Sequence, residues 1–230
     1  KEGVSMSWEG GDPSMESIFS SELEVLLGPA RKGGDELTQK HKDIATSVQR
    51  VTEELIFHIL NHLQKRTGLK SVCIAGGVAQ NSVANGKILE NTKFEEVYIP
   101  SAGHDAGTAM GSALWLFNHI QQNDRLPAVY DAYTGYKTND AEIETCLKDR
   151  NVEFTKYSDK ELIDAVATEI INGAVVGWFQ GRAEFGPRAL GHRSILVDPR
   201  RSDAKELLNS KIKRRESFRP FAPSILEEYV

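Results

Sequence analysis

The residues best suited to chemistry are the arginines of the segment GRAEFGPRALGHRSIL, which covers residues 181–196. Arg182, Arg188 and Arg193 stand there among three glycines and one proline, and Glu184 is the one carboxylate between them. Guanidinium groups bind phosphate and carboxylate oxygens through two parallel hydrogen bonds. Glycines let a backbone wrap closely around an anion. The segment therefore predicts a binding site for a phosphorylated small molecule.

This segment opens a basic stretch. Just before it, residues 173–179 read GAVVGWF, a run typical of a buried strand. Between residues 181 and 219 the chain has eight Arg and three Lys against five Asp or Glu, a balance of +6 in a chain of net charge −5. A basic island in an otherwise acidic chain predicts a local anionic partner. Further phosphate-binding side chains expected to fold onto the same pocket are Lys211, Lys213 and Arg219.

The basic stretch also fits three roles that need no small phosphorylated ligand. The charges over residues 202–215 fit the solvated face of a helix. The arginines of residues 181–196 could instead pair with Glu184 or Asp198 and brace the fold. A nucleic-acid surface would need an extended basic face and aromatic rings that stack on bases. The rings available for that are Phe179, Phe185 and Phe218. A dense loop beside a buried strand favours the small phosphorylated ligand.

A glycine pair stands at the start of a second candidate loop. Gly76 and Gly77 follow the apolar run SVCIA, and a helix-like pattern starts after them. Glycines between a strand and a helix let the backbone approach a ligand and direct helix N–H groups toward it. Asn81 and Asn85 follow, and they either hydrogen-bond a base or sugar or lie on a solvated face. An equally good alternative is that the two glycines are needed only for the geometry of the turn.

The third candidate loop is SAGHDAG, residues 101–107. Asp105 stands there among small residues after a predicted strand. A carboxylate in such a loop is placed to hold a metal ion or a phosphate-bound cation. Capping of the following helix is the equal alternative for Asp105. The neighbouring His104 could join a site, although a single loop histidine is more often solvated.

The elements that would position these loops alternate between strands and helices, which predicts an α/β fold with a parallel or mixed sheet. Ligands then bind at the loops beyond the strand carboxyl ends, here residues 75–78 and 100–107. Helices are predicted over residues 37–64, 78–91, 108–120, 139–151 and 202–215 (with Ser202 as N-cap), and a helix followed by a strand over 159–181. Strands are predicted over residues 70–75 (followed by two glycines), 94–100, 152–157 and 194–200. Residues 1–35 are predicted to be irregular, and 218–226 to be extended because of two prolines.

The totals bound the class of protein. The chain has 230 residues, 40% of them hydrophobic, which suits one or two globular domains. No apolar run approaches the ~20 residues that span a bilayer, and no secretory signal is visible, so a cytoplasmic protein is expected. Cys73 and Cys146 form no metal-binding pattern and are expected to be reduced thiols. Because the first residue is Lys1, the chain is expected to be part of a longer protein.

Four long, ordered motifs together resemble the O-carbamoyltransferases of the NodU/CmcH/TobZ family. They are GGVAQNSVANGKI (76–88), IPSAGHDAGTAMGSAL (99–114), GRAEFGPRALGHRSILVDPR (181–200) and IKRRESFRPFAPSIL (212–226). The resemblance runs from about Phe19 to Val230. It implies two α/β units: the C-terminal part of an actin-like ATPase-superfamily domain (1–122) and, after a linker (123–138), the N-terminal part of a YrdC-like domain (139–230).

The resemblance implies an ATP-dependent reaction. The YrdC-like part would activate carbamoyl phosphate to a carbamoyl adenylate, and the actin-like part would transfer the carbamoyl group to a hydroxyl of a small-molecule acceptor. A piece of this length is expected to be inactive alone. The runner-up acceptors are those of HypF-like maturation proteins and of threonylcarbamoyl-adenosine tRNA modification. A non-catalytic nucleotide-binding module is the most different alternative. Nucleic acid is an unlikely partner, and no membrane is expected.

The resemblance also implies roles for the candidate residues. Asp105 matches a metal-binding aspartate whose two histidine partners lie upstream of Lys1, and the metal would be iron, manganese or magnesium. Arg188, Arg193 and Ser194 match the motif linked to activation and are the predicted catalytic residues. A bend at Gly191 would turn the Arg188 and Arg193 forks toward one anion. Arg182 joins the predicted phosphate-binding residues, and the predicted nucleotide-binding residues are Gly76, Gly77, Asn81 and Asn85.

Overall fold

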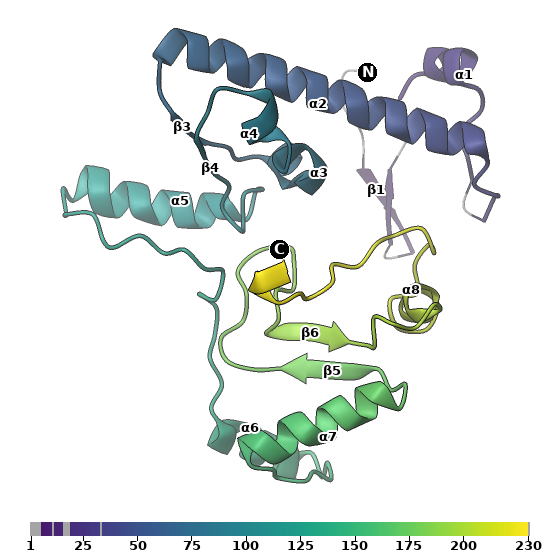
Figure 1. Cartoon of the computed structure of the whole chain (residues 1–230), viewed down its shortest axis with the longest axis vertical. Coiled ribbons are helices and arrows are strands. Elements are labelled where there is room, and N and C mark those ends of the chain that lie inside the picture. Colours follow the sequence, from purple (N-terminus) through teal and green to yellow (C-terminus); the bar gives the residue numbers. More distant parts are fainter. Residues whose placement is uncertain (1–5, 11, 16–18, 33, 230) are drawn as a thin grey trace. The chain divides into compact units, whose positions relative to one another are not determined.

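Figure 1 shows the computed structural model of the chain. The structure describes residues 6–10, 12–15, 19–32 and 34–229. The chain divides into two compact units, residues 1–58 and 59–230, and the division falls inside one long helix. Within the described residues, no helix is both long and apolar enough to cross a membrane.

The first unit contains a hairpin where residues 1–35 are predicted to be irregular. Strands β1 (Met6–Glu9) and β2 (Asp12–Met15) pair antiparallel, and Gly10 takes a φ of 62° after the first strand. Glycine populates this left-handed region without the steric penalty of a Cβ atom. The prediction was wrong because a short hairpin with little apolar alternation has no strong sequence signal.

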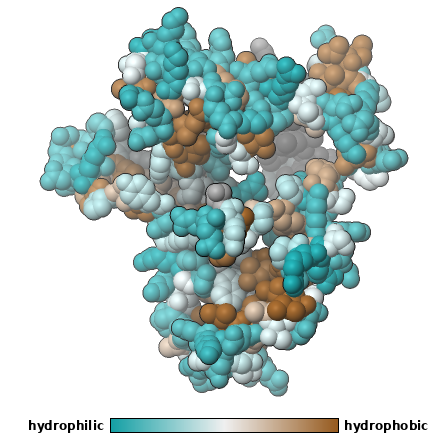
Figure 2. All heavy atoms as spheres, in the orientation of Figure 1, coloured by the Kyte–Doolittle hydropathy of each residue, from teal (hydrophilic) through white to brown (hydrophobic). Residues whose placement is uncertain are grey.

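Helix α1 (Ser21–Leu27) follows in the same region. It begins after Ser20 and ends at Gly28, which has a φ of 90°. Serine often precedes the first residue of a helix, and glycine often follows the last. The sequence therefore carried a signal for this helix, although residues 1–35 were predicted to be irregular. Its side chains Val25 and Leu26 are 87% and 77% exposed, and Figure 2 shows apolar residues over α1.

The long predicted helix is confirmed as α2 (Gln39–Thr67), which ends before Gly68 with a φ of 68°. Apolar residues recur every three or four positions along α2 and form one stripe, but this stripe is not buried. Its exposed members are Val48, Val51, Leu55, Ile59 and Leu63. Leu60, which lies off this stripe, is the buried residue of the helix. The helix therefore has apolar side chains on two faces, and the described residues cover one of them.

The second unit begins with a parallel strand pair, as predicted. Strand β3 (Ser71–Cys73) pairs with β4 (Glu96–Tyr98). The helix predicted between them is broken into three short pieces. They are the 3-10 turn η1 (Gly77–Gln80) and the helices α3 (Ser82–Asn85) and α4 (Ile88–Asn91). The small apolar core of this region comprises Val72, Ala79, Ala84, Ile88, Phe94 and Ala102.

The next predicted helix is confirmed as α5 (Gly107–Trp115), which continues as the π-helical turn η2 (Leu116–Ile120). Residues 121–136 then contain no helix or strand, and Lys137 makes a single bridge to Arg182. Two helices follow, α6 (Asp140–Asp149) and α7 (Asp159–Ile171), close to their predicted ranges.

Strands β5 (Val176–Phe179) and β6 (Arg193–Leu196) form an antiparallel pair. The strand predicted over residues 152–157 does not form. Val152 and Phe154 are exposed, and this segment has no strand partner among the described residues. A strand needs a neighbour for its backbone hydrogen bonds, so an apolar alternating run is insufficient by itself.

The helix predicted over residues 202–215 is shorter, α8 (Ala204–Leu207), and continues as the π-helical turn η3 (Leu208–Ile212). Its N-cap is Asp203, so the assignment of Ser202 was wrong by one residue. Asn209 is completely buried and donates to the carbonyls of Ser217 and Arg219. Residues 218–226 contain no helix or strand, as predicted, and the turn η4 (Glu227–Tyr229) ends the described chain.

The predicted α/β class is confirmed, because helices accompany a parallel pair and an antiparallel pair of strands. Each sheet has two strands, so the described residues form no larger sheet. Cys73 and Cys146 are free and exposed.

Candidate functional site

The arginine-rich segment forms a closed loop between β5 and β6. At its base, the Gln180 N–H donates to the His192 carbonyl (3.0 Å). Inside the loop, Oε1 of Glu184 accepts from the backbone N–H groups of Leu190 (2.7 Å), His192 (2.8 Å) and Arg193 (3.3 Å). A carboxylate that accepts several backbone N–H groups ties the chain around itself. Glu184 therefore braces the loop through backbone groups, not through arginine side chains.

Partial burial by itself would raise the pKa of Glu184, but the backbone hydrogen bonds from Leu190, His192 and Arg193 lower it to about 2. The charged form is the one that these donors stabilise. Because the folded pKa lies below the unfolded value, this carboxylate stabilises the fold fully above about pH 4.5, and its contribution is lost as the pH falls toward 2.

We expect Glu184→Gln to lower the free energy of unfolding at neutral pH, because the amide is uncharged and accepts less strongly. The difference from the natural protein should shrink as the pH falls from about 4.5 toward 2, where Glu184 itself becomes neutral. Thermal unfolding of both proteins over this pH range measures the difference. A difference that does not change with pH would show that the charge of Glu184 is not what holds the loop.

The chain segment before α6 clamps the loop from outside. The Phe185 N–H donates to the Ala132 carbonyl (2.7 Å), and the Gly135 N–H donates to the Ala183 carbonyl (2.9 Å). Gly135 must lack a side chain, because a Cβ atom there would lie 2.8 Å from the Ala183 oxygen. Part of the segment predicted as a linker thus pairs with the arginine loop.

Tyr133 fixes the loop further. Its ring stacks on His192 with centroids 3.8 Å apart, and its hydroxyl donates to the Leu190 carbonyl (2.7 Å). Nδ1 of His192 lies 2.7 Å from the Arg182 carbonyl. A carbonyl can only accept, so Nδ1 carries the proton. Residues 182–192 therefore have a defined backbone before any ligand binds.

The guanidinium of Arg193 donates three hydrogen bonds within this framework. Nη1 donates to the carbonyls of Gln180 (2.6 Å) and His192 (3.0 Å), and Nη2 donates to that of Gly181 (3.2 Å). Its Cζ atom lies 3.4 Å from the centre of the Phe179 ring. In this structure the Arg193 fork is directed at these carbonyls. Its predicted convergence with Arg188 on one anion stays a prediction.

Two further predicted residues also have structural partners. Nη1 of Arg182 donates to the Gly135 carbonyl (2.9 Å), which links the loop to the preceding segment. The Ser194 hydroxyl accepts from the Gly191 N–H (3.0 Å) at the base of the loop. Their predicted roles in activation and phosphate binding remain predictions.

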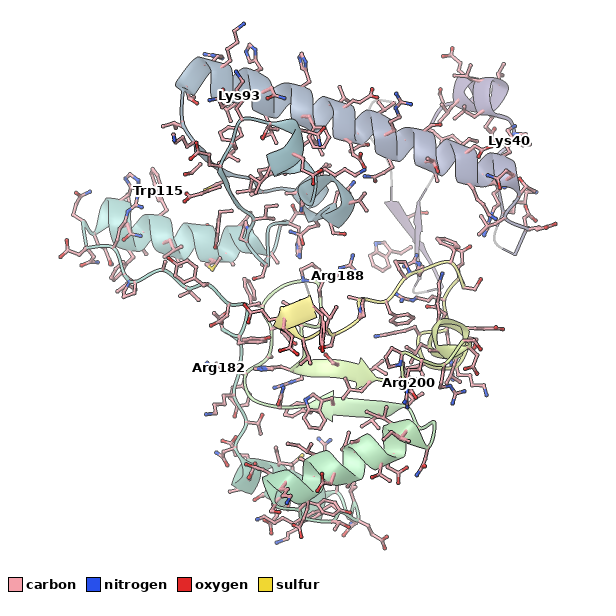
Figure 3. The ribbon with its side chains drawn as sticks, in the orientation of Figure 1. Lys40, Lys93, Trp115, Arg182, Arg188 and Arg200 are labelled. Atoms are coloured by element: carbon pink, nitrogen blue, oxygen red, sulfur yellow. The ribbon has the colours of Figure 1, made fainter. Side chains whose placement is uncertain are left out.

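Arg188 differs from these residues. It is exposed, and among the described residues its guanidinium has no hydrogen bond or ion pair. Figure 3 shows Arg182 and Arg200 at opposite ends of the β5–β6 hairpin and Arg188 away from the strands. The loop is thus held by its other polar side chains and presents Arg188 as its unengaged charge.

Two arginines in the basic stretch after β6 form ion pairs. Arg200 binds both carboxylate oxygens of Asp198, with a shortest distance of 2.7 Å. Arg201 binds Asp203 (2.8 Å) and the Gly173 carbonyl (3.1 Å). Both arginines lie outside residues 181–196, and among the described residues none of Arg182, Arg188 and Arg193 pairs with Glu184 or Asp198 through its side chain. Each of the two ion pairs joins one positive and one negative charge, so the +6 charge balance of residues 181–219 is unchanged.

Hydrogen bonds from Arg200 are the largest influence on the pKa of Asp198, and they lower it. Burial alone would raise this pKa, and the charges of Arg200 and Arg201 lower it further. The pKa of Asp198 is lowered to about 2, so this side chain is a carboxylate at neutral pH. Nearer the C-terminus, Nε of Arg215 donates to Oδ1 of the buried Asn209 (2.7 Å). The side chains of Lys211, Lys213 and Arg219 are exposed and have no hydrogen bond or ion pair within the described part of the chain.

The glycine pair forms a turn with open space around it. Gly76 has a φ of 110°, and a Cβ atom built on Gly76 or Gly77 would meet no atom within 4 Å. The asparagines are partly engaged. Oδ1 of Asn81 caps α3 by accepting from the Ala84 N–H (3.1 Å), and Nδ2 of Asn85 donates to the Ala79 carbonyl (2.8 Å). Backbone of the glycine turn is thus more accessible to a ligand than either amide.

Asp105 lies in the turn before α5 with an exposed side chain. The N-cap of α5 is Ala106 and no side chain caps it, so the helix-cap alternative for Asp105 is wrong. The Ala106 N–H donates to Nδ1 of His104 (3.2 Å), so a neutral ring carries its proton on Nε2. Nε2 is buried and has no partner among the described residues. The described residues contain no cluster of three metal-ligating side chains.

Two hydrogen bonds join the three predicted loops. The Gly76 N–H donates to the Gly103 carbonyl (2.6 Å), which connects the glycine turn to the Asp105 loop. The Ser101 hydroxyl donates to the Phe185 carbonyl (2.9 Å), which connects the Asp105 loop to the arginine loop. Segments more than 80 residues apart therefore form one continuous frame, with Asp105 and Arg188 as exposed charges on it.

Sequence reasoning missed Ser101, Tyr133 and the role of Glu184. Ser101 had a readable signal, because it is the first residue after the predicted strand that ends at Pro100. Tyr133 had none, because nothing in an aperiodic polar segment predicts stacking on a histidine 59 residues later.

The comparisons with known proteins agree with this arrangement of motifs. Residues 18–114 match the family model described as carbamoyltransferase N-terminus, and residues 167–230 match the one described as carbamoyltransferase C-terminus. The chain therefore belongs to the carbamoyltransferase family, a family of transferases.

Named relatives place it within the family. It is 48% identical over 213 residues to an uncharacterized protein of Synechocystis sp.. It is 42% identical to nodulation protein NolO of Bradyrhizobium diazoefficiens over 240 residues and to nodulation protein NolNO of Sinorhizobium fredii over 202 residues. The resemblance to the NodU type is thus confirmed. The matches cover 90%, 95% and 86% of this chain but 35%, 43% and 29% of the relatives, so the chain spans less than half of their length.

Proposed function

We propose that the protein containing this chain is an ATP-dependent O-carbamoyltransferase. Water would hydrolyse carbamoyl phosphate to carbamate and inorganic phosphate. A carbamate oxygen would then attack the α-phosphorus of ATP, and pyrophosphate would leave. The hydroxyl oxygen of a small-molecule acceptor would then attack the carbamoyl carbon of the adenylate. The hydroxyl loses its proton, and AMP leaves with the electrons of the broken C–O bond. Membership of the carbamoyltransferase family supports the group transferred.

The observation that carries this proposal is the hydrogen-bonded frame of three loops. A carbamoyl adenylate hydrolyses readily in water, so activation and transfer benefit from neighbouring sites. The hydrogen bonds from Ser101 to Phe185 and from Gly76 to Gly103 hold three loops next to one another. These loops carry the candidate nucleotide-binding, metal-binding and phosphate-binding residues. This arrangement supports a reaction in which one activated group passes between two sites.

Each loop contributes a distinct interaction under this proposal. The exposed guanidinium of Arg188 binds phosphate oxygens and neutralises charge as a phosphate leaves. The unhindered backbone at Gly76 and Gly77 approaches the nucleotide. Lys211, Lys213 and Arg219 are exposed cations that would add to the attraction of an anionic substrate.

Asp105 is the residue of this chain that would hold a divalent metal ion. Its exposed, uncapping carboxylate fits one ligand position, and the remaining ligands would have to come from outside the described residues. A bound cation would supply a Lewis acid for the carbamoyl carbonyl or the acceptor hydroxyl. Asp105 itself supplies a negative charge on a loop whose base is buried at Ala102.

We expect Asp105→Asn in the full-length protein to lower both metal content and carbamoyl transfer by at least tenfold, because a neutral amide is a much weaker ligand for a divalent cation. Elemental analysis of the purified variant and product formation measure the two effects. Asp124→Asn is the matched control, because Asp124 is exposed in a segment without helix or strand. Normal metal content and transfer in the Asp105 variant would exclude it as a ligand.

The proposed function is tested with the full-length protein, ATP and labelled carbamoyl phosphate. We expect release of phosphate and pyrophosphate, followed by label in a hydroxyl-bearing compound when metabolite extracts are added. No pyrophosphate release would overturn the proposal in favour of a non-catalytic nucleotide-binding module. Strong tRNA binding that weakens steeply with salt would overturn the small-molecule acceptor.

A further inference from the structure

The contact between Ser101 and the arginine loop is a junction between two rigid parts. On one side, Ala102 is completely buried and the Gly103 carbonyl is held by the Gly76 N–H (2.6 Å). A Cβ atom on Gly103 would lie 3.1 Å from the backbone oxygen of Pro100, so this turn is closely packed. Ser101 therefore stands on a base with little freedom to shift.

The arginine loop on the other side is equally constrained. Glu184 binds three backbone N–H groups within the loop, and Tyr133 binds it from outside. The Ser101 hydroxyl donates to the carbonyl of Phe185, three residues before Arg188 (2.9 Å). When two rigid parts meet at one contact, that contact determines where the side chains near it lie.

Gly186 allows the close approach at this junction. A Cβ atom at residue 186 would lie 2.6 Å from the Ser101 carbonyl oxygen and 3.0 Å from its carbon. Both are backbone atoms, so no side-chain rotation would relieve the contact. Gly186 also has a φ of 150°, which residues with a side chain rarely adopt. Any side chain at this position would separate the two loops.

We propose that Ser101 and Gly186 are positioning residues that seat the arginine loop and thereby place the Arg188 guanidinium for anion binding. This inference rests on the proposed function, because it assumes that Arg188 binds a phosphate group. Neither residue touches the ligand: Ser101 acts through the Phe185 carbonyl and Gly186 through the space it leaves.

Ser101→Ala in the full-length protein tests the first residue, with carbamoyl phosphate as the probe and calorimetry as the measurement. Loss of one hydrogen bond at the seat should weaken binding about three- to tenfold with little change in melting temperature. Ser101→Thr keeps the hydroxyl and should restore the affinity to within about twofold. Ser47→Ala is the matched control, because it also removes one hydroxyl-to-carbonyl bond (2.8 Å), within α2.

A double-mutant cycle with Arg188→Lys separates positioning from a general structural role. If Ser101 acts through Arg188, adding Ser101→Ala to Arg188→Lys should weaken binding by less than about twofold further. If the fold losses of affinity from the two substitutions simply multiply in the double variant, the inference is overturned. Loss of affinity in Arg188→Lys with none in Ser101→Ala would overturn the inference alone. An unchanged affinity in Arg188→Lys would overturn the phosphate role of Arg188 and the inference together.

Gly186→Ala and Gly191→Ala test the second residue as a matched pair. Both glycines have a positive φ, 150° and 105°, but a Cβ atom on Gly191 meets nothing within 4 Å. Alanine at 191 therefore adds strain without contact, whereas alanine at 186 adds strain and separates the loops. We expect Gly186→Ala to weaken carbamoyl phosphate binding at least fivefold more than Gly191→Ala. Equal losses would show that the space at Gly186 has no role in positioning.

Discussion

Arg188→Lys in the full-length protein is expected to leave the melting temperature nearly unchanged and to weaken carbamoyl phosphate binding about ten- to a hundredfold. The physical reason is the loss of one charge-assisted, bidentate contact, which contributes roughly 1.5–3 kcal/mol. Lysine keeps the charge but lacks the planar fork, so it should not restore the affinity. Adenylate formation should fall with binding.

The structure makes this variant a clean test. The Arg188 side chain is exposed and has no hydrogen bond or ion pair within the described residues, so its replacement removes none of these interactions there. Calorimetry with carbamoyl phosphate measures the affinity, and thermal unfolding measures the stability. Arg50→Lys, in an exposed pair with Glu54 (2.9 Å), is a matched control that should change neither quantity. An unchanged affinity in Arg188→Lys would show that Arg188 does not bind the phosphate group.

The opposite result is expected for Arg193→Lys: a loss of about 2–3 kcal/mol in the free energy of unfolding, with the affinity of the folded fraction retained. Arg193 donates to three carbonyls and lies over the Phe179 ring. A lysine amine cannot reach all three carbonyls and stack at the same time. Charge-assisted hydrogen bonds and cation–π contacts of this kind support the expected magnitude.

Thermal unfolding and carbamoyl phosphate calorimetry on the same preparation check this expectation. The Arg188 and Arg193 variants serve as each other's control, because they make the same chemical change five residues apart. An Arg193 variant of normal stability and reduced affinity would support the predicted catalytic role of Arg193 over the structural one.

Local physics made several elements readable from the sequence. Helix α2 follows from apolar residues at three- and four-residue spacing and from Gly68 at its end. Helix α6 follows from a capping box in which Asn139 and Glu142 satisfy each other's backbone N–H groups. These signals lie within a few residues of one another, so no distant partner is required. The parallel pairing of β3 with β4 was also predicted, because a helical crossover separates them.

Features that depend on a distant part of the chain, such as strand pairing and burial, were predicted wrongly or had no sequence signal. The run over residues 152–157 alternates like a strand but remains unpaired among the described residues. The apolar stripe of α2 marks a helix correctly, but it does not say which of two apolar faces is covered. Pairing and burial depend on what lies opposite in space, and sequence pattern carries little of that information.

The same division applies to the candidate site. The sequence by itself determined which loops are candidates for the chemistry: the glycine turn, the Asp105 loop and the arginine loop were all identified from local motifs. Only the tertiary structure decided how the arginines are used. Arg193 points its fork at carbonyls of its own loop, while Arg188 remains unengaged among the described residues. Only the tertiary structure seats the loop on Ser101, 84 residues before Phe185. Identical arginine side chains have identical propensities, so their roles are set by the donors and acceptors that the fold brings within about 3 Å of each.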